Sequence, residues 1–340
     1  MAATNTLLPS GLMDVLPPLA GAEYKLIHHF LKSFMGFGYQ PVIPPLAEYE
    51  VSMLAGQGEA TSHQVFRMPD PLGSGMLALR ADMTGQVARI AAGALHASQR
   101  PLRLCYAGYT LRTAPEALKT RRQYTQVGIE RFGDISTNAI AEILAIATHA
   151  LATGADKKLS IDLHYPAILP ALLAELPPQH RDAVRDAVRL KDAARLRQLK
   201  ADTIAAIMES AGDAQRAFKL LKAAKAPEQA LGELEALVAA LTAQTMGADI
   251  TIDILDLCGY EYYCGIGYAI YWQSPAIEVA RGGCYTTNTG EQAVGFTLYI
   301  DDLLEHLPID PALPIAKIPY GTPAADAVKK QAEGFVTVFE

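Results

Sequence analysis

Three groups of strand-like segments, joined within each group by short links, constrain the fold of this chain most strongly. The groups lie within residues 65–80, 102–132 and 268–299, where apolar, β-branched and aromatic side chains gather between turn-like stretches. Links of hairpin length join antiparallel strands, because a parallel crossover usually needs a helix. We therefore predict an α+β fold, an antiparallel sheet flanked by helices, rather than a doubly wound parallel sheet.

The composition changes near Pro166 and changes back near Ile250. Residues 166–246 are rich in Ala, Leu and Arg with helical spacing, and they predict four or five short helices. Strand-like patterns resume after them. We predict an all-helical insertion at 166–246 within a discontinuous core made of 1–165 and 247–308.

The last segment, 309–340, is proline-rich and short. Its pattern predicts a small α/β tail with a strand at 315–319, a helix at 324–331 and a strand at 336–339.

Charge and cysteine content exclude several classes of function. The net charge of −7 argues against a large nucleic-acid footprint, which needs a basic face. The four cysteines form no CxxC pair and the eight histidines form no HExxH pattern, so we predict no metal site and no cofactor. Sparse cysteines and the lack of an export signal predict a reducing cytoplasm, and no apolar run suggests a membrane span.

The stretch from Thr251 to Tyr271 concentrates groups that could hold a small polar ligand. Three tyrosines and a glutamate crowd together there: Tyr260, Glu261, Tyr262 and Tyr263. No Lys or Arg occurs between Thr251 and Ala280, although phosphate chemistry would normally need a cation. The stretch therefore predicts binding without chemistry. Upstream, Thr84 is predicted to cap a helix over 85–95.

Five short segments occur in an order that identifies a family. They are GYQPVIPP (38–45), the pair YAGYTLR (106–112) and RQYTQVGIE (122–130), GYEYYCG (259–265), GGCY (282–285) and AVGFT (293–297). The set resembles the catalytic core of histidyl-tRNA synthetase, a class II aminoacyl-tRNA synthetase, from about residue 7 to 308. The resemblance implies the class II fold and a dimer-forming first motif. It also implies that no complete anticodon-binding domain follows, because 309–340 is too short.

Four positions depart from the family pattern. Cys258, Cys284 and Asp302 stand where the family has arginines, and Ala114 replaces an acidic residue. Adenylate formation needs positive charge on the α-phosphate and on the departing pyrophosphate. Losing one such donor typically costs about 2.7–4 kcal/mol of transition-state stabilisation. The resemblance therefore implies a chain without catalytic residues for amino-acid activation.

The resemblance implies that the amino-acid pocket is kept. Its positions are Asp82 and Thr84 for the ligand ammonium, Arg112 or Gln126 for the carboxylate, and Glu130 with Tyr262 or Tyr263 for an imidazole. Two alternatives stay open: Arg112 pairs with an acid of its loop, and Glu130 is a buried carboxylate bonded to a tyrosine. If Glu130 holds an imidazolium, affinity should weaken as the pH rises above the pKa of the ligand.

A synthetase-like core that keeps this pocket and loses its nucleotide site resembles the regulatory subunits of ATP phosphoribosyltransferase. The resemblance implies a non-catalytic subunit needed, with a short catalytic chain, for the first step of histidine biosynthesis and its feedback inhibition by histidine. It also implies a homodimer within a hetero-octamer. Histidine would bind either the ancestral pocket or the interface between the two chain types. The alternatives are a truncated synthetase-like activating enzyme and a binding module for an unrelated partner.

Overall fold

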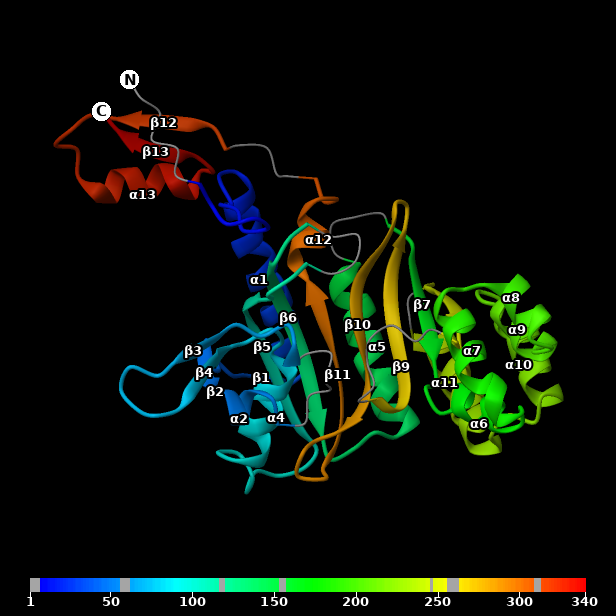
Figure 1. The fold of residues 1–340 in the computed structure, drawn as a ribbon. Helices are drawn as coiled ribbons and strands as arrows, with labels where there is room; N and C mark the ends of the chain where they lie inside the picture. Colours follow the sequence, from blue (N-terminus) through cyan, green and yellow to red (C-terminus); the bar gives the residue numbers. More distant parts are fainter. Residues whose placement is uncertain are drawn as a thin grey trace.

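A computed structural model describes residues 7–55, 62–115, 120–152, 157–244, 247–255, 263–308 and 313–340. Its centre is an eight-stranded sheet in the order β1-β5-β6-β11-β10-β9-β7-β8 (Figure 1). The strands are β1 (Gln40–Pro41), β5 (Leu102–Leu111), β6 (Gln123–Phe132), β7 (Leu159–His164), β8 (Asp249–Ile252), β9 (Tyr263–Gln273), β10 (Ala276–Thr286) and β11 (Gln292–Tyr299).

The central pairs of this sheet are antiparallel, which confirms the predicted α+β class. The two outermost pairs, β1 with β5 and β7 with β8, are parallel. These parallel edges were not predicted, because each joins segments separated by long stretches of chain that contain helices. Sequence spacing identifies hairpins well but says little about such distant pairings.

Helices cover the two faces of the sheet unequally. On one face α1 (Leu19–Gly36) and α5 (Thr137–Leu151) pack over the middle strands, and the ring of Phe34 meets the edge of Phe296 at 5.6 Å between centroids. The large apolar core lies between these helices and the sheet. On the other face α4 (Thr84–Ala92) packs near β5 and β6 and leaves part of the sheet uncovered. A short helix, α12 (Ile300–Leu304), follows β11.

Six helices follow β7 in the described residues 157–244, where four or five were predicted. They are α6 (Ile168–Ala174), α7 (Pro178–Arg189), α8 (Ala193–Gln198), α9 (Asp202–Met208), α10 (Ala214–Ala223) and α11 (Glu228–Gln244). Asp192 and Asp213 begin two of these helices. Each side chain accepts a hydrogen bond from the backbone amide three residues further along the chain, and so caps α8 or α10.

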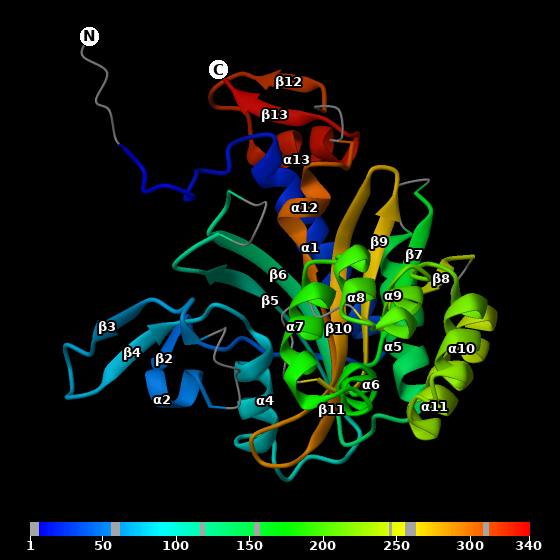
Figure 2. The same cartoon turned by 45° about the vertical axis from the view of Figure 1, so that its right-hand side comes forward.

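These helices gather beside β7 and β8 at one end of the sheet (Figures 1 and 2). Leu234, Leu237 and Leu241 of α11 are fully buried and belong to the same apolar core as α5. We propose that residues 166–246 are an insertion into the core of 1–165 and 247–308, as the sequence predicts.

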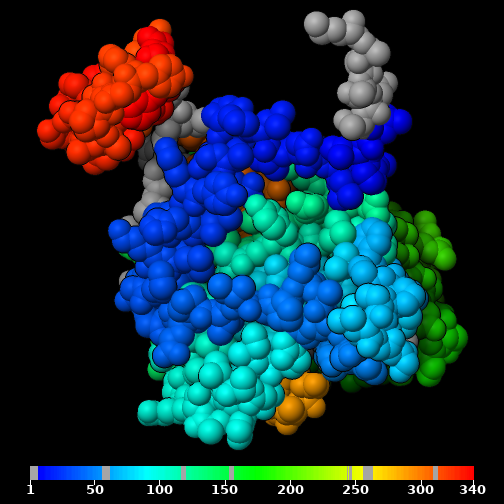
Figure 3. Space-filling view, turned by 90° about the vertical axis from the view of Figure 1, so that its left-hand side faces the viewer, coloured from blue at the N-terminus to red at the C-terminus, as the bar shows by residue number. Residues whose placement is uncertain are grey.

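Two smaller units complete the described chain. A three-stranded sheet is formed by β2 (Ala47–Tyr49), β4 (Met76–Leu79) and β3 (Arg67–Pro69), with α2 (Glu50–Met53) beside it. The C-terminal unit contains β12 (Ile315–Ile318), α13 (Ala324–Ala332) and β13 (Val336–Phe339), and its strands pair in parallel. Figure 3 shows this unit protruding from the body of the molecule. None of the helices in the described part of the chain is long and apolar enough to cross a membrane.

Candidate functional site

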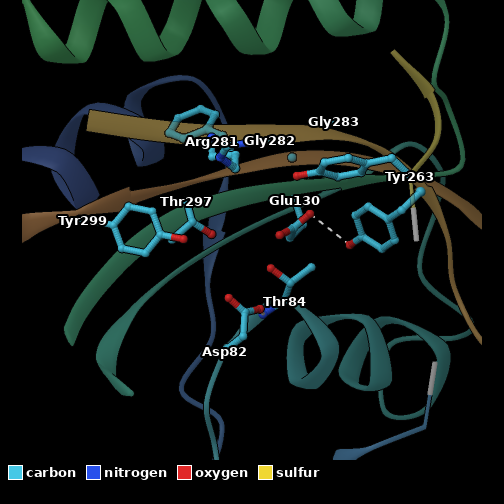
Figure 4. Close-up of a pocket in the computed structure, with 12 residues that line it drawn as sticks. Asp82, Thr84, Glu130, Tyr263, Arg281, Gly282, Gly283, Thr297 and Tyr299 are labelled. Atoms are coloured by element: carbon cyan, nitrogen blue, oxygen red, sulfur yellow. Dashed lines mark hydrogen bonds between the residues drawn. The ribbon is translucent and has the colours of Figure 1, made fainter. Parts of the chain in front are cut away.

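A small polar pocket lies on the α4 side of the sheet (Figure 4). Its outline takes in about 300 Å³ of space not occupied by atoms, open solvent included. It is lined by Asp82, Thr84, Glu130, Tyr263, Arg281, Gly282, Gly283, Tyr285, Gly295, Phe296, Thr297 and Tyr299. Four of the residues predicted for the ligand pocket therefore come together here: Asp82, Thr84, Glu130 and Tyr263.

A row of glycines forms the floor of the pocket. Glu130 of β6 pairs with Gly295 of β11, which pairs with Gly283 of β10, which pairs with Gly267 of β9. A Cβ atom at Gly295 would lie 2.1 Å from Oε2 of Glu130, and one at Gly283 would lie 3.0 Å from the ring of Tyr263. The Glu130 carboxyl and the Tyr263 ring thus lie directly over these two positions, and only glycine leaves room for them there.

Glu130 is the buried acid at the centre of the pocket, with 1% of its surface exposed. Its Oε2 atom accepts a hydrogen bond of 2.9 Å from the Tyr285 hydroxyl, and its Oε1 atom accepts a longer one of 3.4 Å from Tyr106. Burial raises the pKa of Glu130 to about 8, and the charge of Asp82 adds to the rise while hydrogen bonds from Tyr285, Thr84 and Tyr106 oppose it. Glu130 therefore carries a proton at neutral pH when the pocket is empty.

Asp82 links the pocket to the start of α4. Its Oδ1 atom accepts a hydrogen bond of 2.8 Å from the amide of Thr84, and its Oδ2 atom accepts one of 2.9 Å from Nε2 of Gln126. The prediction that Thr84 is the N-cap was wrong: α4 begins at Thr84, and the preceding Met83 makes no side-chain cap. The carboxylate two residues before the helix satisfies its first amide instead.

Neither residue predicted for the ligand carboxylate lines the pocket. Gln126 is fully buried and is engaged with Asp82 and, through Oε1, with the amide of Met83 at 3.1 Å. The guanidinium of Arg112 lies over the ring of Tyr124, 5.0 Å from its centroid, and donates a long bond to a backbone carbonyl. Tyr262, the other predicted imidazole contact, lies outside the described residues.

The positions where the family has charged residues face elsewhere. Cys284 is 1% exposed and packs in the large apolar core on the opposite face of the sheet, where burial raises its pKa. Ala114 is exposed beyond the end of β5, and Asp302 is partly exposed in α12. None of these three lines the pocket. Cys258 lies outside the described residues.

The sequence analysis missed four polar side chains of the pocket: Arg281, Tyr285, Thr297 and Tyr299. Arg281 is 8% exposed, and its Nε atom donates a bond of 2.7 Å to Glu278 in the same strand. The Thr297 hydroxyl lies 2.8 Å from that of Tyr106. The available signal was the alternation of β10, which places Arg281 on the same face as Gly283 and Tyr285. Arg281 directly follows Ala280, where the stretch without Lys or Arg ends.

The side chains that line the pocket are those of a binding site for a small polar molecule. Two acids, Asp82 and Glu130, lie on one side, and a guanidinium, Arg281, lies on the other (Figure 4). Hydroxyl groups between them can donate or accept hydrogen bonds. No group of three His, Cys, Asp or Glu residues in the described ranges is arranged to hold a metal ion.

Comparison with known proteins gives one consistent result. The chain matches the histidyl-tRNA synthetase family over residues 11–303. ATP phosphoribosyltransferase regulatory subunits from Rhodospirillum centenum and Paramagnetospirillum magneticum are 38% and 39% identical, over 99% of this chain and 90% and 91% of theirs.

Solved structures agree in fold. A Bacillus halodurans structure, described as an ATP phosphoribosyltransferase regulatory subunit/histidyl-tRNA synthetase, has a TM-score of 0.84 at 22% identity and covers 100% of this chain and 94% of its own. A chain of the ATP phosphoribosyl transferase (HisG:HisZ) complex from Thermotoga maritima has a TM-score of 0.66 at 21% identity, covering 82% of this chain and 97% of its own.

Proposed function

This chain belongs to the histidyl-tRNA synthetase family as a regulatory subunit of ATP phosphoribosyltransferase, and we propose that it serves that enzyme without catalysing a reaction itself. Its partner is the short catalytic chain, and together they carry out the first step of histidine biosynthesis. The observation that carries the proposal is the identity of 38% and 39% to regulatory subunits over 99% of this chain. The proposed assembly is a homodimer within a hetero-octamer.

The content of the pocket supports the non-catalytic role. Activation of an amino acid by ATP needs several cations directed at the α-phosphate and at the departing pyrophosphate. Among the described lining residues Arg281 is the one cation, and Glu278 binds its guanidinium. Cys284 and Asp302, at two positions where arginines belong in the synthetases, contribute no positive charge.

We assign histidine, the feedback inhibitor, to this pocket. Glu130 and Asp82 provide acceptors for a cationic ligand, and the tyrosine hydroxyls around Glu130 hold its carboxyl in place. An imidazole that enters takes the proton of Glu130 and becomes an imidazolium paired with a carboxylate. A charge-assisted hydrogen bond of this kind is among the stronger contacts a pocket can offer.

The raised pKa of Glu130 changes the expected pH dependence of binding. The imidazole of the free ligand titrates near about 6.5 and Glu130 near about 8, so between these values the two groups together carry one proton before and after binding. Affinity should then be flat in this window. It should fall above it, where a proton must be taken up, and below it, where one must be released. The weakening expected just above the ligand pKa therefore moves up toward pH 8.

Mixing the purified chain with the short catalytic chain tests the function directly. We expect faster phosphoribosyl transfer in the mixture than with the catalytic chain alone, and inhibition by histidine only in the mixture. The chain alone should show no ATP–pyrophosphate exchange with histidine. An unchanged transferase rate after mixing would refute the regulatory role, and measurable exchange would favour an activating enzyme.

A second variant separates sensing from assembly. Glu130→Gln should keep the stimulation of the catalytic chain while weakening inhibition by histidine at least about 10-fold, because a neutral amide cannot pair with an imidazolium. Inhibition that is unchanged in this variant would place the effector at the interface between the two chain types instead.

A further inference from the structure

At the anion-binding end of the pocket, the structure departs from what the family resemblance implies. The two residues predicted to meet a ligand carboxylate, Arg112 and Gln126, do not line the pocket, and Gln126 is engaged with Asp82. An amino acid held by its cationic groups alone would leave its carboxylate beside two acids. A pocket for a zwitterion needs a cation at the far side.

We propose that Arg281 receives the carboxylate of the bound amino acid and so makes the pocket selective for amino acids over amines of the same shape. This assignment rests on the proposed function, and it names the residue that sets the specificity of that site. Arg281 lines the pocket from β10, on the opposite side of Glu130 from Asp82 and Thr84 (Figure 4).

The sheet register supports the placement. Arg281 pairs with Thr297 of β11, and Thr297 pairs with Gly128 of β6, two residues before Glu130. Arg281 and Glu130 thus stand two strands apart, roughly 10 Å across the sheet. In the adjacent row, Gly295 and Gly283 leave room for the Glu130 carboxyl and the Tyr263 ring, which lie over them. The Glu130 carboxyl therefore lies over β11, the strand beside Arg281, and a small zwitterion can bridge the guanidinium and the carboxyl.

Glu278 acts as a positioning residue for this cation. It lies three residues before Arg281 on the same strand, where a register shift between Glu278 and Ala280 lets both side chains meet. Their contact engages Nε and Nη2 of the guanidinium. Such a pair holds the planar guanidinium in one orientation, so a ligand that binds does not have to order the arginine side chain.

The adjacent cross-strand neighbour, Thr297, adds a second polar group at the same end. Its hydroxyl contacts the Tyr106 hydroxyl, which in turn contacts Glu130. The anion-binding and cation-binding ends of the pocket are therefore connected through hydroxyl groups. We expect this chain of contacts to fix the spacing between the two ends.

Calorimetric titration of the full chain with L-histidine and with L-histidinol tests the assignment, because the two ligands differ only in the carboxylate. The wild-type chain should bind histidine roughly 10- to 100-fold more tightly than histidinol. Arg281→Met should bring that ratio close to one while histidinol affinity changes less than about threefold, and Arg281→Lys should give an intermediate ratio. Arg197→Met, at an exposed ion pair in the helical region, is the matched control and should leave both affinities unchanged.

Arg281→Met leaves the Glu278 carboxylate half-buried without its cation, so a second variant keeps the test decisive. The double variant Arg281→Met with Glu278→Met removes both charges and should fold, bind histidinol and lack the preference for histidine. A histidine-to-histidinol ratio that stays at the wild-type value in either variant overturns the assignment, as does an equal loss of both ligands in the double variant. If the wild-type chain binds no histidine, the proposed effector site itself is refuted, whatever the variants do.

Discussion

The two faces of the central sheet are built from the same strands but from different kinds of side chain. Toward α1 and α5 the strands present Val127, Ile129, Phe296 and Leu298, all buried in one apolar core. On the α4 side a smaller apolar cluster that includes Leu104 and Phe132 packs against the helix, and around the pocket the alternate positions are acids, hydroxyls, glycines and Arg281. Because successive side chains of a strand point to opposite faces, one face can stabilise the sheet while the other remains hollow and polar. The polar face is therefore supported by packing on the apolar one.

The comparison predicts the largest loss of stability on the apolar face. Phe296→Ala should lower the free energy of unfolding by about 3–5 kcal/mol, because it leaves a cavity beside Phe34. Urea unfolding measures this loss. Ile43→Ala, at a side chain that is 93% exposed, should change it by less than about 0.5 kcal/mol. A loss below about 1 kcal/mol for Phe296→Ala would show that this face contributes less than its burial indicates.

The polar face should make stability depend on pH. The pKa of Glu130 rises from 4.5 when exposed to about 8 in the fold, so the folded chain binds more protons between these values. This contribution is complete below the unfolded pKa and is lost as the pH rises toward 8, by a few kcal/mol in total.

Thermal unfolding of the ligand-free chain across pH 5 to about pH 8 tests this, with Glu130→Gln as the comparison. The difference in stability between the two proteins should shift steadily in favour of the variant as the pH rises. A constant difference would mean that Glu130 stays ionised in the fold.

The glycine floor can be closed by a single methyl group. Gly295→Ala brings a Cβ against the Glu130 carboxyl and should cost about 1–3 kcal/mol of stability, together with most of the histidine affinity. Gly232→Ala is the matched control, because a Cβ there meets nothing within 4 Å and the site is within α11. That change should be neutral or stabilising by up to about 1 kcal/mol. Full histidine binding by Gly295→Ala would show that the ligand does not occupy this space.

The smallest expected effect concerns one hydroxyl of the pocket. Thr297→Val removes the 2.8 Å contact with the Tyr106 hydroxyl at nearly constant volume and should cost about 1 kcal/mol. Urea unfolding in the absence of ligand measures this. A variant as stable as the wild type would indicate that water replaces the lost hydroxyl at no cost.

Much of the site was predictable because its residues sit in segments with a recognisable pattern. Asp82, Thr84, Glu130 and Tyr263 were predicted for the pocket, and the structure places all four along its lining. Arg112, predicted as one of two contacts for the ligand carboxylate, does not line the pocket, and this has a physical reason. An arginine at the end of a strand has several partners within reach, and here the Tyr124 ring and a backbone carbonyl hold it.

Arg281 and Tyr285 were harder to assign to the pocket from the sequence. Tyr285 bonds to Glu130 across 155 positions of sequence, and Arg281 reaches the pocket through the register of three strands. Local patterns show which residues share a face of one strand, but they do not show which strand lies next to it.

The sequence by itself determined the class of fold, the helical nature of the segment that follows β7 and the alternation of side chains along each strand, since these follow from hairpin spacing and from side-chain periodicity. Only the tertiary structure decided the parallel edges of the sheet, the row of glycines beside Glu130 and the presence of a cation opposite the acids. Those features arise where strands far apart in the chain come into register, and register depends on the packing of the whole sheet.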